Sequence, residues 1–251
     1  TPLFETIEKD GVVKNLSIKS PQYSRRFATD QIRIKVFGFV ACENKGVIEN
    51  ISISDATLEC EEYMKVGAIT GVTTNLHNEG SVKSCTVTGN ISGASVVGGA
   101  IGRSYYGDIQ ELYFEGSVEG DVVGGVIGEL NHSDIQNSKA EGCVEGTTTV
   151  GGFVGAADHS TIERCGSLSN VEALVRGGGF SGELYETSVV DFYSRGSVSA
   201  KDQVAGFSPL IGEADTVSIY WDYPSSTLSS QHKTDNCVDM DAESIEMLLS
   251  I

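Results

Sequence analysis

The stretch Val123-Gly-Gly-Val-Ile-Gly128 and its near copy Val150-Gly-Gly-Phe-Val-Gly155 decide the fold of this 251-residue chain. Five looser copies of the same glycine and apolar phrase start at Val36, Val66, Val97, Gly177 and Val204. Successive starts differ by 30, 31, 26, 27, 27 and 27 residues. A nearly fixed period of this length indicates a repeat architecture.

A second phrase lies between these copies: an aliphatic residue, two further residues, an apolar, cysteine or serine residue, and then an alternating strand. It begins at Val13, Ile48, Val82, Ile109, Ile135, Ile162, Val189 and Val217. Its fourth residues are Leu16, Ile51, Cys85, Leu112, Ser138, Cys165, Phe192 and Tyr220. Alternation with period two is typical of half-buried strands. Glycines such as Gly116 and Gly142, which follow in most copies, allow tight corners with positive φ.

The period predicts an all-β protein, a parallel β-solenoid of about seven to eight coils. A unit of about 27 residues cannot fold alone and must bury its apolar edge on the next copy. A β-propeller is the competing repeat fold, but its blades need roughly 40 residues. We expect irregular N-terminal coils at 1–65, regular repeats at 66–223 and an acidic cap at 224–251, with a short helix N-capped by Asp241.

Composition narrows the choice of partners. The net charge of −18 argues against nucleic acid, and no apolar run approaches the roughly 20 residues that cross a membrane. Residues 1–50 carry a net charge of +2 and residues 51–251 a net charge of −20. Two readings of the basic N-terminal residues stay open, namely solvated turns or a patch that contacts an acidic partner. These residues are Lys14, Lys19, Arg25, Arg26, Arg33 and Lys35.

The six cysteines include no CxxC pair, which argues against a zinc knuckle. Cys85 and Cys165 share the inward column but lie three coils apart. That separation of about 14 Å forbids a disulfide and predicts two small buried hydrophobic residues. Cys42 and Cys60 belong to the irregular second coil, where a disulfide is one alternative.

The repeat register aligns His132, His159 and Glu186, each three residues before an aliphatic anchor. Two imidazoles and a carboxylate are a ligand set for a divalent metal such as zinc. Neighbouring rungs are about 4.8 Å apart, so one adjacent pair could share a metal, whereas all three would need to lean together. The alternative is a stack of polar turn residues.

Aromatic residues suggest a second candidate site. Trp221 and Tyr223 are the surface candidates for stacking against a sugar ring, whereas Tyr220 falls at an inward position. Tyr105 and Tyr106, after the third copy of the glycine phrase, are a weaker version of the same idea.

Four segments carry a family resemblance. Val123-Gly-Gly-Val-Ile-Gly128 is followed by Ile135-Gln-Asn-Ser138 and Gly142-Cys-Val144, and the chain closes its repeats with Tyr220-Trp221-Asp222. Over nearly its whole length the chain resembles the GLUG-motif repeats of bacterial surface proteins. Such repeats occur in adhesin-like proteins and in non-catalytic regions of Gram-positive immunoglobulin A peptidases, which are zinc enzymes with an H-E-x-x-H helix.

This chain contains no H-E-x-x-H segment. The resemblance therefore implies a non-catalytic interaction or spacer module, secreted or on the bacterial surface, without a cofactor. It implies a monomer or a part of a longer chain, with a host protein or glycan as partner.

A carbohydrate-active β-helix enzyme is the alternative function. It would need carboxylates clustered around a basic residue on one face, whereas the arginines are spread along the chain, and we expect no carboxylate column beside them. These are Arg103, Arg164, Arg176 and Arg195.

Overall fold

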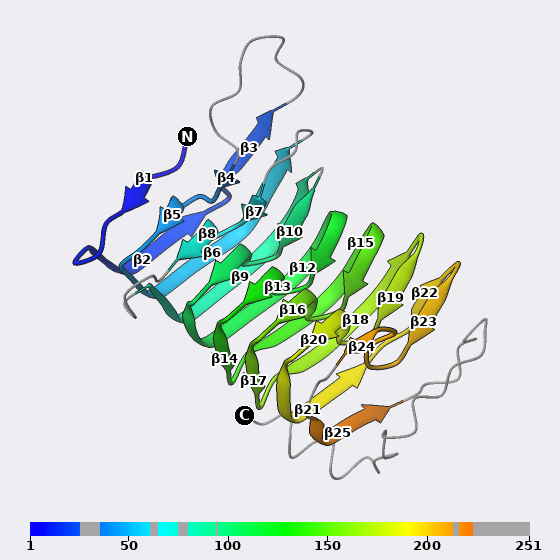
Figure 1. Cartoon of the computed structure of the whole chain (residues 1–251). Helices are drawn as coiled ribbons and strands as arrows, with labels where there is room; N and C mark the ends of the chain where they lie inside the picture. The colour runs from blue at the N-terminus through cyan, green and yellow to red at the C-terminus, as the bar shows by residue number, and fades with distance from the viewer. Residues whose placement is uncertain (26–35, 61–64, 75–79, 94, 213–215, 223–251) are drawn as a thin grey trace.

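The computed structural model describes residues 1–25, 36–60, 65–74, 80–93, 95–212 and 216–222, the last segment as backbone only. The predicted all-β parallel β-solenoid is confirmed: the strands of successive coils lie side by side in parallel from β1 to β25 (Figure 1). The described residues form about six turns, fewer than the seven to eight coils expected. The predicted helix within 224–251 lies outside the described residues.

Each coil contributes one short strand to an eight-stranded sheet. In order, its members are β1 (Phe4–Ile7), β5 (Ala41–Asn44), β8 (Thr70–Thr74), β11 (Ile101–Tyr105), β13 (Ile127–Asn131), β16 (Val154–Asp158), β20 (Ser181–Tyr185) and β24 (Ile211–Gly212).

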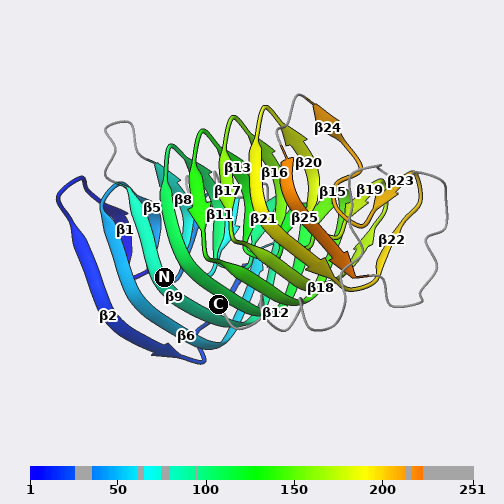
Figure 2. The same cartoon turned by 90° about the horizontal axis from the view of Figure 1, so that it is seen from below.

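The other strands form one continuous hydrogen-bonded sheet that wraps the rest of the coil (Figure 2). Its N-terminal members are β2 (Val12–Lys19), β3 (Gln22–Arg25), β4 (Val36–Phe37), β6 (Val47–Cys60), β7 (Lys65–Gly67), β9 (Ser81–Gly93), β10 (Val96–Gly98) and β12 (Asp108–Gly124). Its later members are β14 (Asp134–Gln136), β15 (Lys139–Gly151), β17 (Thr161–Glu163), β18 (Gly166–Ala173), β19 (Arg176–Gly178), β21 (Ser188–Arg195), β22 (Val198–Ala200), β23 (Gln203–Ala205) and β25 (Thr216–Asp222). None of these described residues forms a helix that could cross a membrane.

The pairing register follows the sequence period closely. Val97 pairs with Val123, and Val123 with Val150, so the glycine phrase stacks on itself. The second phrase does the same from Val82 to Val189. The last copy differs from the prediction by one residue.

In that last copy Val189 pairs with Thr216, and Phe192 pairs with Ile219, so Tyr220 does not continue the column of Phe192. The residue 27 positions after Val189 is Thr216, so the repeat length is unchanged here. The sequence prediction started this copy at Val217 because Val217 is aliphatic, and it was wrong by one residue.

The coil interior is filled by stacked aromatic and aliphatic side chains. Phe153, Phe180 and Phe207 are fully or almost fully buried, and their rings stack at centroid distances of 5.0 and 5.7 Å. The glycine phrase turns the chain beside them. A Cβ atom at Gly125 would overlap the carbonyl oxygen of Gly152 in the next coil, so this close approach requires glycine.

The cysteine predictions divide. Cys85 and Cys165 are buried as expected, and their thiols donate to the carbonyls of Lys83 and Glu163 at 3.0 and 3.3 Å. Burial raises the pKa of Cys165 to about 12. The disulfide alternative for the second coil is wrong: Cys42 lies in β5 and Cys60 ends β6, and no disulfide joins them.

Two predicted regions are only partly visible. Lys14 and Lys19 of the basic patch are exposed on β2. The remaining side chains of that patch lie outside the described residues, as does Cys237: Arg25, Arg26, Arg33 and Lys35.

Candidate functional site

The end of the eight-stranded sheet turns into the next strand through a single residue in the left-handed region. In four successive coils this residue is Tyr106, His132, His159 and Glu186, with φ of 58°, 46°, 47° and 42°. We call these four residues the corner column. Residues other than glycine seldom adopt this backbone conformation, so each corner needs stabilising contacts nearby. The column contains the three residues predicted as metal ligands and adds a tyrosine.

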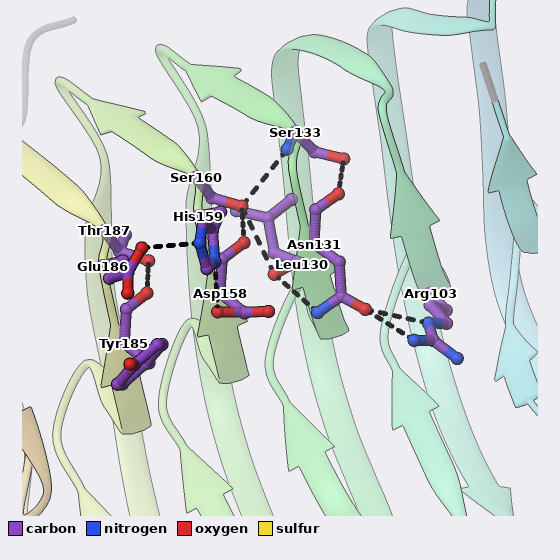
Figure 3. A network of polar contacts seen from close by, with 10 residues as sticks. All are labelled: Arg103, Leu130, Asn131, Ser133, Asp158, His159, Ser160, Tyr185, Glu186 and Thr187. Carbon is purple, nitrogen blue, oxygen red and sulfur yellow. Dashed lines mark hydrogen bonds and ion pairs between the residues drawn. The ribbon is translucent and has the colours of Figure 1, made fainter. Parts of the chain in front are cut away.

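A buried hydroxyl supports each of the last three corners. The hydroxyls of Ser133, Ser160 and Thr187, one residue after the corner, donate to the carbonyl two residues earlier at 2.7, 2.8 and 2.8 Å (Figure 3). Two of these hydroxyls also connect neighbouring coils. Ser160 Oγ accepts the N–H of Ser133 at 3.2 Å, and Ser133 Oγ accepts the N–H of Gly107 at 2.9 Å. Ser133 and Ser160 therefore each close their own turn and hold the coil before it.

The corner side chains contact one another along the stack. The imidazoles of His132 and His159 lie face to face, with centroids 4.8 Å apart and planes 2° apart, and Tyr106 adds its ring 4.9 Å from His132. Nδ1 of His159 lies 2.7 Å from Oδ1 of Asp158, and Nε2 lies 2.5 Å from Oε2 of Glu186. One imidazole thus bridges two carboxylates from two coils.

These contacts set the protonation of His159. The hydrogen bond with Asp158 raises its pKa above the ordinary value, and the negative charges of Glu186 and Asp158 add to the rise, while partial desolvation opposes it. The arrangement therefore favours the imidazolium form, which can donate from both nitrogens.

The geometry favours a turn stack over the predicted metal site. Both nitrogens of His159 already face carboxylates, and Nδ1 of His132 is buried without a hydrogen-bond partner. Parallel rings do not direct their nitrogens at a common point. Across the described parts of the chain, no group of three His, Cys, Asp or Glu side chains is placed to hold a metal ion.

A second column lies beside the first. Tyr105, Asn131, Asp158 and Tyr185 are consecutive register partners at the ends of β11, β13, β16 and β20. Asn131 accepts two hydrogen bonds from Arg103, at 3.1 Å from Nε and 2.6 Å from Nη2 (Figure 3). The two columns together, eight residues on four coils, are termed the corner surface.

The predicted aromatic sites have different outcomes. Trp221 lies in β25, of which only the backbone is described, and Tyr223 lies outside the described residues. Tyr105 and Tyr106 lie on the corner surface with ring centroids 4.5 Å apart. The two tyrosines are adjacent in the sequence. They lie near His132, His159 and Tyr185 because the register stacks these residues from successive coils.

The structure also shows a feature that the sequence reasoning missed. A groove of about 490 Å³ lies across the C-terminal parts of β12, β15, β18 and β22, and we call it the acidic groove. Glu119, Glu145 and Glu172 are consecutive register partners along it. The sequence reasoning considered carboxylate columns beside the arginines only, whereas the cation that lines this groove is Lys201. The signal was available, because each glutamate directly follows an inward valine in the repeat.

Comparison with known proteins adds one finding. No family model matches the chain, and no curated protein matches it in sequence. A solved structure of a putative immunoglobulin A1 protease from Bacteroides ovatus superposes with a TM-score of 0.56 at 19% sequence identity. The match covers 84% of this chain and 68% of that chain. At this identity the likeness concerns the fold, and the resemblance to GLUG repeats stays a prediction.

Proposed function

We propose that this chain is a non-catalytic interaction module of a secreted or surface-exposed protein, within a larger peptidase-like or adhesin-like chain. The rigid parallel stack carries this proposal. Each coil repeats the same exposed positions about 4.8 Å further along, which creates an extended surface suited to long or repetitive ligands. On the corner surface, side chains of neighbouring coils are held together, as His159 is by Glu186 and Asn131 by Arg103.

Two further observations support the same proposal. The Bacteroides ovatus protein that shares this fold is a putative immunoglobulin A1 protease, which is consistent with a solenoid region in a peptidase-like secreted protein. The sequence here lacks an H-E-x-x-H segment, and the imidazoles of His132 and His159 stack face to face, with His159 between two carboxylates. A role in contact with a partner accounts for both.

The test uses the purified chain in two assays. Labelled chain is applied to mucosal epithelial cells, immobilised mucin and immunoglobulin A1, and retention is measured. The same chain is incubated with immunoglobulin A1, and the heavy chain is followed on a gel. We expect retention on at least one surface without cleavage. Cleavage by the purified chain would contradict the non-catalytic role, and absence of retention everywhere would reduce the module to a spacer.

A second candidate function rests on the acidic groove. Glycoside hydrolases need a pair of carboxylates that flank the scissile bond, and the column of Glu119, Glu145 and Glu172 offers adjacent carboxylates with Lys201 nearby. The check is release of reducing ends or of unsaturated uronate from neutral and acidic polysaccharides. Product that disappears in Glu145→Gln would support an enzyme; the leading proposal expects none.

A further inference from the structure

The corner surface exposes aromatic rings at both of its ends. Tyr106 and Tyr185 are 37% and 45% exposed, among the most exposed large apolar side chains of the described residues. Between them the chain places the stacked imidazoles of His132 and His159, and Tyr185 approaches His159 with ring centroids 6.0 Å apart. The two imidazoles cover each other's faces, whereas the rings of Tyr106 and Tyr185 are tilted by 51° and 52° from the neighbouring imidazole and keep exposed apolar surface for a ligand.

Polar groups with complementary hydrogen-bonding capacity lie between these rings. The side chains of Asp158 and His159 are each 42% exposed, and that of Glu186 is 35% exposed. The carboxylates keep lone pairs beyond those that face His159, and Asn131 adds an amide. A ligand that alternates apolar ring faces with hydroxyl groups fits such a surface, because it satisfies both kinds of contact.

The surface is held in place before any ligand arrives. Arg103 fixes Asn131 and also lies 3.2 Å from Glu129, while His159 connects Asp158 to Glu186. Side chains that are already ordered lose less conformational entropy when a ligand binds.

The spacing of the coils sets the length of the ligand. Four rungs about 4.8 Å apart span roughly 14 Å along the stack. One rung is comparable to the advance of a single pyranose ring in an extended polysaccharide. About three consecutive sugars could therefore run from Tyr106 to Tyr185, each above one step of the stack.

Charge decides which glycans fit. The chain carries a net charge of −18, and the corner surface itself contains Asp158 and Glu186. The cations beside them are both paired: the His159 imidazolium lies between Asp158 and Glu186, one positive charge against two carboxylates, and Arg103 lies 3.2 Å from Glu129. Uronate-rich or sulfated glycans would be repelled by this field.

From these observations we propose that the corner surface binds a neutral, extended polysaccharide whose chain runs along the axis of the solenoid. This proposal rests on the proposed interaction function and names its ligand class. The rings of Tyr106 and Tyr185 stack on sugar faces, and Asp158 and Glu186 accept hydrogen bonds from sugar hydroxyls. His159 positions both carboxylates.

The experiment is titration calorimetry of the purified chain with neutral hexasaccharides, namely cellohexaose, laminarihexaose, mannohexaose and chitohexaose. An alginate hexasaccharide is the charged comparison. We expect saturable binding of at least one neutral probe and none of alginate. Tyr106→Ala and Tyr185→Ala should each weaken binding about tenfold, the loss of one ring contact.

Two further variants separate binding from folding. Tyr113→Ala removes a tyrosine of β12 that contacts Lys139 and Glu141, away from the corner surface, and should leave affinity unchanged. Asp158→Asn keeps both rings but removes a charged acceptor, and it should weaken binding. Melting temperature is measured for every variant, so that a loss of affinity in a folded protein is recognised.

Four results would overturn the proposal. The first three are that no neutral hexasaccharide binds, that alginate binds better, or that affinity survives in the Tyr106→Ala/Tyr185→Ala double variant. The fourth is retention of immunoglobulin A1 or cells that free hexasaccharide does not compete, which points to a protein partner. In that case the interaction function stands and the glycan fails. Cleavage of a probe would instead refute the non-catalytic role.

Discussion

Removing the hydroxyl of Ser160 tests whether buried side chains hold the corner column. Ser160 is almost fully buried, donates to the Asp158 carbonyl at 2.8 Å and accepts the Ser133 N–H at 3.2 Å. In Ser160→Ala both backbone groups lose this partner inside the stack. A buried unsatisfied polar group costs about 1–3 kcal/mol, so we expect a loss of about 2 kcal/mol in the free energy of unfolding.

The assay is thermal unfolding followed by circular dichroism, with urea unfolding as a second measure. For a domain of this size, about 2 kcal/mol corresponds to a fall of roughly 4–8 °C in melting temperature. Ser160→Thr is the matched control, because Thr187 occupies the equivalent position in the next coil and makes the same bond at 2.8 Å. It should change stability by less than about 0.5 kcal/mol.

Two outcomes would refute this reasoning. If Ser160→Ala melts with the wild-type protein, the hydroxyl does not support the corner. If Ser160→Thr is as unstable as Ser160→Ala, the effect arises from packing and not from hydrogen bonding. Ser199→Ala, at an exposed position, sets the baseline for a serine change without a buried bond.

Further measurements follow from the same structure. Gly116 has φ of 151°, and a Cβ there would overlap the Gly89 carbonyl. Gly116→Ala should therefore lower the free energy of unfolding in urea by about 3 kcal/mol or more. In the control Gly177→Ala the new Cβ lies 3.2 Å from its nearest atom, and the loss should be under about 1 kcal/mol. Phe180→Ala should cost about 3–5 kcal/mol and Phe180→Leu clearly less, and equal losses would argue against the ring stack. Because the folded-state pKa of His159 is raised, its stabilising contribution is complete below the unfolded-state pKa of about 6.5 and disappears as pH rises through the folded-state value. An NMR titration midpoint at or below about 6.5, or unchanged pH dependence of melting in His159→Gln, would contradict this. Calorimetry with zinc should show no saturable heat; binding that His159→Gln abolishes would restore the metal hypothesis.

Much of the fold was predictable because every repeat of the sequence has the same pattern of inward-facing residues. The period-two alternation correctly placed Cys85 and Cys165 in the core, and the register aligned His132 with His159. The prediction was wrong where a local aliphatic residue competed with the period, as at Val217. It was also wrong where membership of one coil was taken for proximity, as for the cysteine pair of the second coil.

The candidate site was less predictable for a physical reason. The sequence shows which residues share a column, but not the backbone conformation that directs their side chains. The structure shows both the left-handed φ of His159 and the hydrogen bond of Ser160 that supports it. The sequence shows only that a residue with a hydroxyl follows the corner residue in successive repeats. The column of Glu145 escaped notice because an exposed glutamate after a buried valine is ordinary in any strand.

The hydroxyl behind the last three corners has an evolutionary consequence. Since Ser133, Ser160 or Thr187 closes the turn there, the side chain of the corner residue is not needed to close it, and both histidine and glutamate are accommodated. Duplication of one 27-residue unit followed by a change at a single codon would thus add a new recognition element without a new fold. Single substitutions in the corner column could therefore change the ligand specificity of the protein one coil at a time.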